Sequence, residues 1–575
     1  MRPEKISPGL LLALQDYQNE FRQGLALQKR SLGIVSQQNS PKPARIVVFI
    51  YCDEDAQLDH LAEYGIRVNQ SSGRVRTAFL PIESLDRLSE ESAIARIKPS
   101  RYLKALMDVA PGKVNLPQFK TQNSLSGKGV IIGIVDSGID SKHPAFTGRI
   151  LRIWDQTLPG AGVQEGGYGI ELTGRQLQTS IDTNGHGTHV AGIASGADSN
   201  YGGVAPEAEL LIVKSDLQDA HIADGIRYIF RVAQELGRPA VVNLSLGGHA
   251  DAHDGSDSLS LIIDAETGPG RIVCCAAGNE GNDNIHGQAI LPPLSLRSLR
   301  FRVPEGVVGI AWLNAWYPGN CTFEVSVQTP GGFVTPFQGV LPSSDPVREY
   351  TLADARVQIV TPQPDPVNGD NNFFVQIRGV SGRAVKGGIW QLRVRNKSSA
   401  EGRLDVWTLD DRSAVFFSGA SVKDSMKIGS PGAANSAITV ASYTTKVQWT
   451  DIDGNLREIG LELDNISDFS SEGPLRNLAQ KPDVAAPGAV IISALSSDST
   501  PEPAFRIDQI HVGLLGTSMA CPFMAGIVAL LLERDPNLDP EQVKQLLRDN
   551  SLIPGKAPGT GDNKWGFGLI NALNL

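Results

Sequence analysis

Four segments of the chain carry residues whose types suit nucleophilic catalysis. In chain order they contain Asp136 at the end of an apolar run, His186 between two glycines, Asn279 after a glycine, and Ser518 at the start of an apolar helix. A hydroxyl becomes an effective nucleophile when a neighbouring base, such as an imidazole, takes its proton. A carboxylate can orient that imidazole, and an amide N–H beside a backbone N–H can stabilise an oxyanion. Together the four residues predict an acyl-transfer site.

Each segment alone has a plainer interpretation. Asp136 can cap a turn, Asn279 can occupy a left-handed turn, and Ser518 can be a helix N-cap. His186 and His189 lie three residues apart and can share a helical face, as metal ligands do. No glutamate stands at the spacing of a zinc protease, so we expect no metal site and interpret His189 as structural.

The sequence pattern around these residues predicts a doubly wound parallel α/β sheet that positions them. Between residues 127 and 290, buried apolar runs alternate with helical patterns. We expect strands at 128–135, 209–214, 240–245 and 272–277, and helices at 188–194, 220–236 and 258–266. Ligands bind such sheets at the carboxyl ends of their strands. Because the four candidate residues lie at strand ends or helix starts, they should gather at one edge.

The N-terminal part predicts a smaller α+β unit. Residues 8–30 have helical spacing, and a linker follows. Strands at 44–51, 74–80 and 93–97 alternate with helices at 53–65 and 83–88, of which the first should bury Leu58, Leu61 and Ala62. This order is typical of a ferredoxin-like fold.

A region with a third sequence pattern, that of short alternating strands, interrupts the α/β pattern. Short alternating strands are expected at 300–303, 309–313, 322–327, 373–377, 390–394 and 404–408. Such spacing indicates an inserted antiparallel β-sandwich. From Ser436 the α/β pattern resumes, and it ends in helices at 518–533 and 540–549. We therefore divide the chain into 1–43 (helix and linker), 44–115 (ferredoxin-like), 116–290 (first α/β block), 291–417 (β-sandwich) and 418–575 (second α/β block).

Composition narrows the class of protein. Of 575 residues, 41% are hydrophobic and 20% are charged, which excludes a wholly disordered chain. A net charge of −10 does not indicate the basic surface that nucleic-acid-binding proteins carry. Apolar runs such as 527–532 are shorter than the ~20 residues of a membrane span. The five cysteines form no CxxC motif, so we expect neither a disulfide framework nor a zinc site. No hydrophobic signal segment is visible, so we expect an intracellular protein by default, with export by a non-standard route as the alternative.

The order Asp–His–Ser and the residues around each member resemble the subtilisin family of serine proteases. The matching segments are Val135-Asp136-Ser137-Gly138, Gly185-His186-Gly187-Thr188-His189, Ala277-Gly278-Asn279 and Gly516-Thr517-Ser518-Met519-Ala520. The resemblance implies a serine endopeptidase for protein or peptide substrates, with catalytic Asp136, His186 and Ser518 and with Asn279 in the oxyanion hole. It further implies that substrate contacts Ser245, Leu246, Gly247, Gly248, Ala276, Ala277, Gly278 and Glu280.

The resemblance also assigns roles to the other units. The ferredoxin-like unit resembles a subtilisin propeptide, which implies an intramolecular inhibitor. Its tail Pro99–Asp108 would lie in the substrate cleft and be cleaved near Leu106–Met107. The segment Gly148–Gln156 and a jelly-roll-like insertion are similar to the clostridial germination proteases.

Departures from the family pattern bear on metals and specificity. Ala145 follows His143-Pro144 where many relatives carry a calcium-binding Asp, and the segment 196–202 is short. We expect no strong calcium site and no cofactor.

We favour a large apolar residue before the scissile bond, although Glu280 would admit Lys or Arg. We expect a monomer. The alternative function is a regulatory or binding protein whose cleft is held by its own prodomain.

Overall fold

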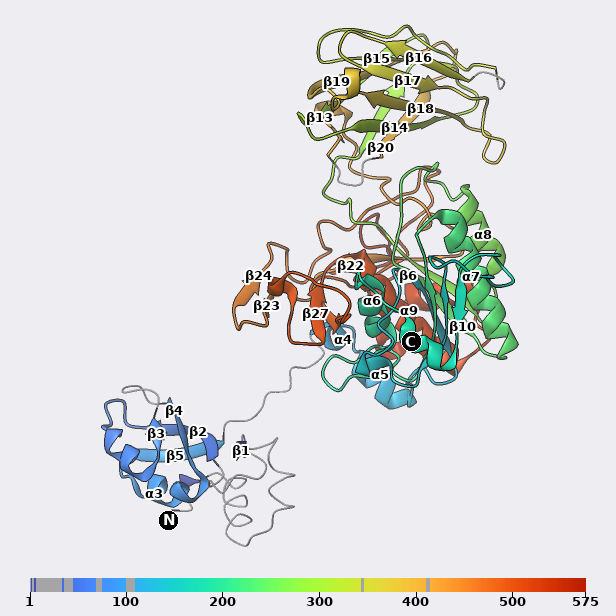
Figure 1. The fold of residues 1–575 in the computed structure, drawn as a ribbon. Helices are drawn as coiled ribbons and strands as arrows, with labels where there is room; N and C mark the ends of the chain where they lie inside the picture. The colour runs from blue at the N-terminus through green and yellow to red at the C-terminus, as the bar shows by residue number, and fades with distance from the viewer. Residues whose placement is uncertain are drawn as a thin grey trace. The chain divides into compact units, whose positions relative to one another are not determined.

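The computed structural model describes residues 2, 5–6, 34–35, 45–68, 75–99, 109–342, 346–409 and 414–575. The chain forms two compact units, Met1–Ala105 and Leu106–Leu575 (Figure 1). The helix expected at 8–30 and the cleavage expected near Leu106–Met107 fall outside the described residues.

The first unit contains an antiparallel sheet. Its strands are β1 (Ile34–Val35), β2 (Arg45–Cys52), β3 (Arg67–Val68), β4 (Val75–Pro81) and β5 (Ile94–Pro99). They follow the order β1-β2-β4-β3, and β5 also pairs with β2. The strands expected at 44–51, 74–80 and 93–97 correspond to β2, β4 and β5.

Short helical segments cover this sheet: η2 (Asp59–Tyr64), η3 (Ile82–Ser84) and α3 (Leu85–Glu90). The helix expected at 53–65 is a shorter 3₁₀ segment. Leu58 and Leu61 are buried as expected, but Ala62 is exposed. A 3₁₀ helix has three residues per turn, so positions 58 and 61 share a face and position 62 does not. The prediction for Ala62 was therefore wrong.

The second unit is built on a ten-stranded sheet. Its strands are β6 (Ile131–Asp136), β7 (Ile150–Asp155), β8 (Ile170–Leu172), β9 (Glu209–Lys214), β10 (Ala240–Leu244), β11 (Arg271–Ala276), β22 (Ile438–Tyr443), β25 (Val484–Pro487), β28 (Ser551–Leu552) and β29 (Leu569–Ile570). Their order is β28-β29-β25-β22-β11-β10-β6-β9-β7-β8. The pairs from β29 to β7 are parallel, and the outermost strands β28 and β8 pair antiparallel with their neighbours.

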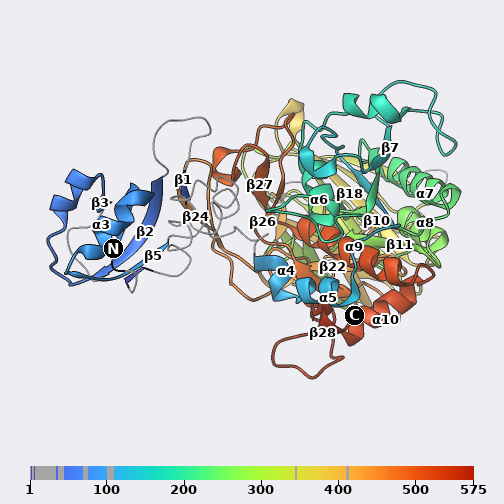
Figure 2. The ribbon, with the colours of Figure 1, turned by 90° about the horizontal axis from the view of Figure 1, so that it is seen from below.

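Helices pack on both faces of this sheet (Figures 1 and 2). Ile132 and Ile134 of β6 join a core that contains α6 (His186–Ser195), α9 (Thr517–Arg534) and α10 (Pro540–Asp549). Ile131 and Val135 join a second core that contains α7 (Asp219–Glu235) and α8 (Ser258–Glu266). Because neighbouring residues of a strand face opposite sides, continuous apolar strands fill both cores.

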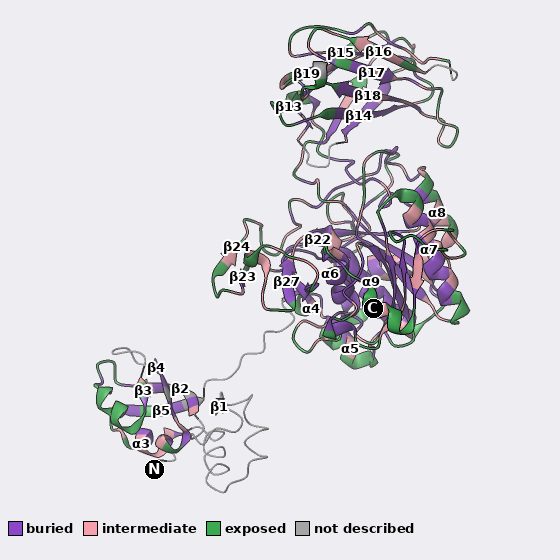
Figure 3. Ribbon diagram, in the orientation of Figure 1, coloured by how far each residue is buried: buried purple, intermediate pink, exposed green. Residues whose placement is uncertain are grey.

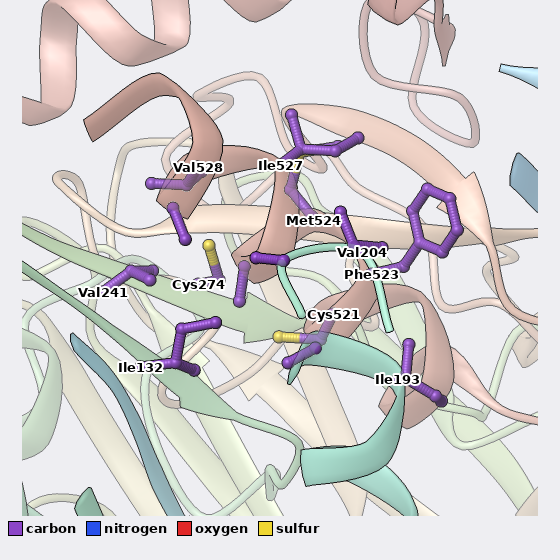
Figure 4. Close-up of a cluster of buried hydrophobic side chains, with 14 of the residues drawn as sticks. Ile132, Ile193, Val204, Val241, Cys274, Cys521, Phe523, Met524, Ile527 and Val528 are labelled. Carbon is purple, nitrogen blue, oxygen red and sulfur yellow. The ribbon is translucent and has the colours of Figure 1, made fainter. Parts of the chain in front are cut away.

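α9 lies at the centre of the first core. Figure 4 shows its side chains Cys521, Phe523, Met524, Ile527 and Val528 among residues of the sheet and of neighbouring segments. Among the described helices, α9 is the one long and apolar enough to cross a membrane, and most of it is buried inside the fold. All five cysteines are buried and free.

Two further antiparallel sheets enclose a separate core within the second unit (Figure 3). The six-stranded sheet has the order β12-β20-β14-β18-β17-β16, and the four-stranded sheet has the order β15-β19-β13-β21. The strands are β12 (His286–Leu291), β13 (Leu296–Val303), β14 (Ile310–Tyr317), β15 (Phe323–Gln328), β16 (Val347–Thr351), β17 (Arg356–Val360), β18 (Asn371–Arg378), β19 (Gly388–Asn396), β20 (Gly402–Thr408) and β21 (Phe416–Phe417).

Two expected boundaries shift. β12 begins at His286 and pairs with β20, so the antiparallel region begins before residue 291. α4 (Val109–Lys113) belongs to the second compact unit, although we expected the N-terminal domain to extend to 115. The remaining elements of the second unit are α5 (Leu116–Asn123), β23 (Gln448–Thr450), β24 (Leu456–Glu458), β26 (Ile491–Ala494), β27 (His511–Leu514) and the 3₁₀ segments η4 (Pro144–Phe146), η5 (Gly174–Thr179), η6 (Val380–Gly382), η7 (Gly419–Ser421), η8 (Pro503–Phe505) and η9 (Ala572–Asn574).

Candidate active site

Asp136 and His186 form a direct contact at the carboxyl edge of the ten-stranded sheet. Asp136 is the last residue of β6, and its side chain is buried. His186 is the first residue of α6, and its Nδ1 lies 2.8 Å from Oδ1 and 3.0 Å from Oδ2 of Asp136. The carboxylate therefore accepts a hydrogen bond from the Nδ1–H group, which leaves Nε2 as the basic nitrogen of the ring.

The glycines beside His186 allow α6 to start this close to β6. Gly185 caps the helix with a φ of 83°, in the left-handed region that favours glycine. A Cβ on Gly187 would lie 2.2 Å from the carbonyl oxygen of Gly138. Any larger residue at position 187 would therefore push His186 away from Asp136.

A buried carboxylate that the sequence analysis missed, Asp182, holds the same two elements together. Its Oδ1 accepts hydrogen bonds from Ser137 Oγ and Gly185 N, each at 2.9 Å. Its Oδ2 accepts from the backbone N and Oγ1 of Thr188, at 2.9 and 2.7 Å. Asp182 is thus a positioning residue for His186. Its one sequence signal is an acidic residue just before a helix start, which is too common to be diagnostic.

Asn279 lies after β11 and contacts the start of α9. Its Oδ1 accepts hydrogen bonds from the N and Oγ1 of Thr517, at 2.9 and 3.0 Å. Since Oδ1 is occupied by Thr517, the Nδ2 group remains as a donor for another acceptor. Ser518 is the second residue of α9, and its backbone N–H is among those that a helix start leaves without an intrahelical partner. These two donors are the ones expected to form the oxyanion hole.

The Ser518 hydroxyl donates to the carbonyl oxygen of Ser245, at 3.2 Å. The Ser245 hydroxyl donates in return to the carbonyl oxygen of Ser518, at 2.9 Å. Within the described residues, no hydrogen bond joins Ser518 to His186. Such catalytic contacts are often long in ligand-free enzymes and tighten when substrate binds.

A cavity of about 200 Å³ adjoins Ser518. All eight residues expected to bind substrate line it, together with His249, Gly429, Ser430, Asn279, Thr517 and Ser518. His249 follows the two glycines at 247 and 248 and was not predicted, because nothing in its local pattern distinguishes it. The cavity is placed to receive a side chain of a ligand whose reacting group contacts Ser518.

Glu280 carries a fixed charge in this cavity. Its Oε2 lies 3.4 Å from His249 Nε2 and accepts hydrogen bonds from Asn279 N at 2.8 Å and Ser471 Oγ at 2.9 Å. Burial acts to raise the pKa of Glu280, but these partners outweigh it and hold the pKa below its usual value. Glu280 is therefore ionised at neutral pH.

The pKa values of the two histidines of α6 are shifted in opposite directions. Burial opposes protonation of His186, but the charge of Asp136 and its hydrogen bond outweigh burial, so the pKa of His186 is raised. His189 is fully buried, and burial lowers its pKa to about 3. The Nε2 of His189 lies 3.1 Å from the carbonyl oxygens of both Ile491 and Val512. This environment agrees with a neutral, structural His189.

Comparison with solved structures identifies the class of fold. The structure of the CspB protease of Clostridium perfringens matches with a TM-score of 0.67 and 24% identity, covering 81% of this chain and 97% of that chain. The likeness establishes a subtilisin-like fold.

Comparison of sequences identifies the family. The model of the subtilase family (peptidase S8) matches residues 127–295 and 377–568, more than half of the chain. The serine protease AprX of Bacillus subtilis is 24% identical over 504 residues, which cover 85% of this chain and 75% of AprX. The major intracellular serine protease of the same species is 30% identical over 215 residues, which cover 36% of this chain and 59% of that protein. The chain belongs to the subtilase family and is a subtilisin-like serine endopeptidase.

Proposed function

We propose that the protein hydrolyses peptide bonds through Asp136, His186 and Ser518 and a covalent acyl-enzyme intermediate. The observation that carries this proposal is the contact of the Asp136 carboxylate with the Nδ1 of His186, at the sheet edge where Ser518 begins α9. The contact fixes the tautomer that a general base requires. Ser518 would need to turn from Ser245 to give its proton to His186.

The chemistry then follows from the placement of each group. Ser518 Oγ attacks the peptide carbonyl while His186 Nε2 takes the hydroxyl proton. Asp136 stabilises the resulting imidazolium without itself taking the proton. The Asn279 amide and the Ser518 N–H stabilise the oxyanion. His186 returns the proton to the leaving amine, and a water molecule, deprotonated by His186, hydrolyses the acyl-enzyme. The cavity lined by Ser245–Gly248 and Ala276–Glu280 receives the side chain before the scissile bond.

We further propose that the N-terminal unit is a prodomain and that the protein cleaves the segment joining the two units. Support comes from its compact five-stranded sheet, which precedes the protease unit in the chain, and from the division of the chain at Ala105. We propose that this N-terminal unit acts as an intramolecular inhibitor of the protease. We also propose that the antiparallel sheets between 286 and 417 make the protease unit more rigid.

Intact mass and N-terminal sequencing of the wild type beside Ser518→Ala test both proposals. We expect the wild type to yield a new N-terminus between residues 100 and 120 and Ser518→Ala to remain whole. Labelling with a fluorophosphonate, which requires an activated and accessible serine, should modify Ser518 in the wild type. An unlabelled wild-type protein would favour the alternative, a binding protein with an occupied cleft. Labelling without cleavage would support the proposed protease function and contradict the proposed self-processing.

A further inference from the structure

The outer surface of the four-stranded sheet β15-β19-β13-β21 is rich in arginine. Residues along β13 and β19 alternate between the core enclosed by the two antiparallel sheets and this outer surface. Four arginines point outward, Arg300 and Arg302 on β13 and Arg393 and Arg395 on β19. We call the surface that they form the arginine face. The four strands contribute one acidic residue, Glu324 of β15.

Glu324 compensates one of these cations. It forms an ion pair with Arg395, in which Arg395 Nε donates to Oε2 at 2.8 Å. Within the described residues, no ion pair joins Arg300, Arg302 or Arg393 to an acidic side chain. The whole chain carries a net charge of −10, so three arginines without a counter-charge on one sheet are a local excess of positive charge. An anionic partner would compensate this charge.

Apolar and aromatic residues accompany the arginines. Leu296 and Ile389 lie near opposite ends of the paired segments of β13 and β19, and they are 44% and 41% exposed. The ring of Phe337 lies 5.3 Å from the guanidinium of Arg393 and 4.4 Å from that of Arg395. Stacking on an aromatic ring orients a guanidinium and leaves the N–H groups at its edge available. Protein interfaces combine arginine with aromatic and apolar residues in this way, so the arginine face suits a polypeptide partner.

The sheet register sets the spacing of the three uncompensated arginines. Arg393 pairs with Ser298, which lies two residues before Arg300 on β13. Arg393 and Arg300 are therefore diagonal neighbours, about 7–8 Å apart, and Arg300 and Arg302 are about 7 Å apart along one strand. Side chains at alternate positions of an extended peptide point to the same side and repeat at about 7 Å. Carboxylates at three alternate positions of an extended segment would therefore match the three arginines.

We propose that the arginine face binds an extended segment of a partner protein that carries acidic residues at three alternate positions. Arg300, Arg302 and Arg393 each bind one carboxylate, and a guanidinium can do so through two parallel hydrogen bonds. A long polyanion such as RNA fits less well, because it would extend beyond the face over an acidic protein. The proposal is independent of the peptidase activity, since no residue of the arginine face lines the cavity beside Ser518.

The test measures the binding of a fluorescent peptide by its anisotropy. The peptide carries glutamate at three alternate positions, separated by serine and flanked by leucine. The protein is the full chain with Ser518→Ala, so that the peptide is not cleaved. We expect saturable binding that weakens as salt is raised, because the contacts join exposed charges. Adding Arg300→Gln and Arg393→Gln should weaken the binding about tenfold.

The matched control replaces two exposed cations outside the arginine face, Lys128→Gln and Arg175→Gln, and makes the same change in net charge. It should leave the affinity within about twofold of that of the Ser518→Ala protein, because salt screens exposed charges that do not contact the peptide. The denaturant transitions of both double variants should match that of the Ser518→Ala protein, since substitutions at the surface change stability little. A loss of binding in the arginine variant is then a loss of contacts.

The remaining outcomes decide the chemistry of the partner. A peptide with glutamine in place of glutamate should bind at least about tenfold more weakly, and equal affinity would overturn the proposal. An equal loss of affinity in the two double variants would also overturn it, because the overall charge of the protein would then explain the binding. Binding of a single-stranded RNA but not of the peptide would replace the acidic segment by a nucleic acid. Self-association in sedimentation velocity that Arg300→Gln and Arg393→Gln abolish would replace it by a second copy of the chain.

Discussion

Both oxygens of the Asp136 carboxylate lie within hydrogen-bond distance of His186 Nδ1, at 2.8 and 3.0 Å. His186 is partly exposed, with 29% of its side chain accessible, whereas Asp136 is buried at 5%. A buried anion thus faces a base that substrate can reach, and this contact raises the pKa of the base.

This contact predicts the acid limb of the pH profile. The general base must be neutral, and the raised pKa of His186 moves its deprotonation above the usual value of 6.5. We expect kcat/KM to rise with pH along a limb whose midpoint lies above 6.5. In Asp136→Asn the midpoint should move down, and kcat should fall by about 10⁴. Steady-state kinetics with a fixed peptide substrate would measure both. An unchanged midpoint in Asp136→Asn would show that another group controls the limb.

Replacement of Asn279 should act on the chemical step. Thr517 holds Oδ1 of Asn279 and so turns its amide donor outward, toward a developing oxyanion. We expect Asn279→Ala to lower kcat by about 10²–10³ with a much smaller change in KM. Thr517→Val keeps the backbone donor and loses only the hydroxyl, so its effect should be far smaller. If Asn279→Ala changed KM alone, Asn279 would bind substrate rather than stabilise the transition state.

The elements that position the site were predictable because their patterns are local. The strand at Glu209–Lys214 and the helix at Ser258–Glu266 occur with the expected bounds. A parallel strand buried on both faces is continuously apolar, and a helix start carries polar caps, so both can be recognised without tertiary information. The placement of Asp136 and His186 at adjoining ends follows directly from these elements.

The missed features depend on contacts between distant segments. His249 acquires its place from Asn314 and, through His253, from Trp407. No local pattern links these residues, because the chain between them forms separate sheets. The strand β16 (Val347–Thr351) was missed for a different reason, since its residues are exposed or half-buried and lack the apolar alternation of a core strand.

His189 predicts the acid sensitivity of the protease unit. Its folded-state pKa of about 3 lies below the usual 6.5, so the unfolded chain binds a proton that the folded chain excludes. The contribution of neutral His189 to the free energy of unfolding is therefore fully present above about pH 6.5 and is lost as the pH falls toward 3. His189→Gln should flatten the dependence of unfolding free energy on pH over this range by up to about 1.4 kcal/mol per pH unit. Urea unfolding at several pH values would measure it. An unchanged slope in His189→Gln would show that His189 does not cause the acid sensitivity.

Arg476 predicts how firmly the antiparallel sheets are held. Its guanidinium forms ion pairs with Asp254 and with Asp370, and its Nε donates to Ala252 O at 2.7 Å. Asp370 precedes β18, whereas Asp254 lies between β10 and α8, so Arg476 ties the two sheet systems together. Asp254 and Arg476 are each only 7% exposed. Removal of the cation would leave a buried carboxylate without its counter-charge.

We expect Arg476→Met to destabilise the second unit by about 3–5 kcal/mol, measured from its denaturant transition. Arg297→Met, at an exposed arginine of β13, is the control and should cost far less. In the background of Asp254→Asn, the cost of Arg476→Met should shrink, because the buried charge is already absent. Equal costs in both backgrounds would mean that Arg476 acts through packing, for instance against the Trp316 ring 5.4 Å away, rather than through its ion pair.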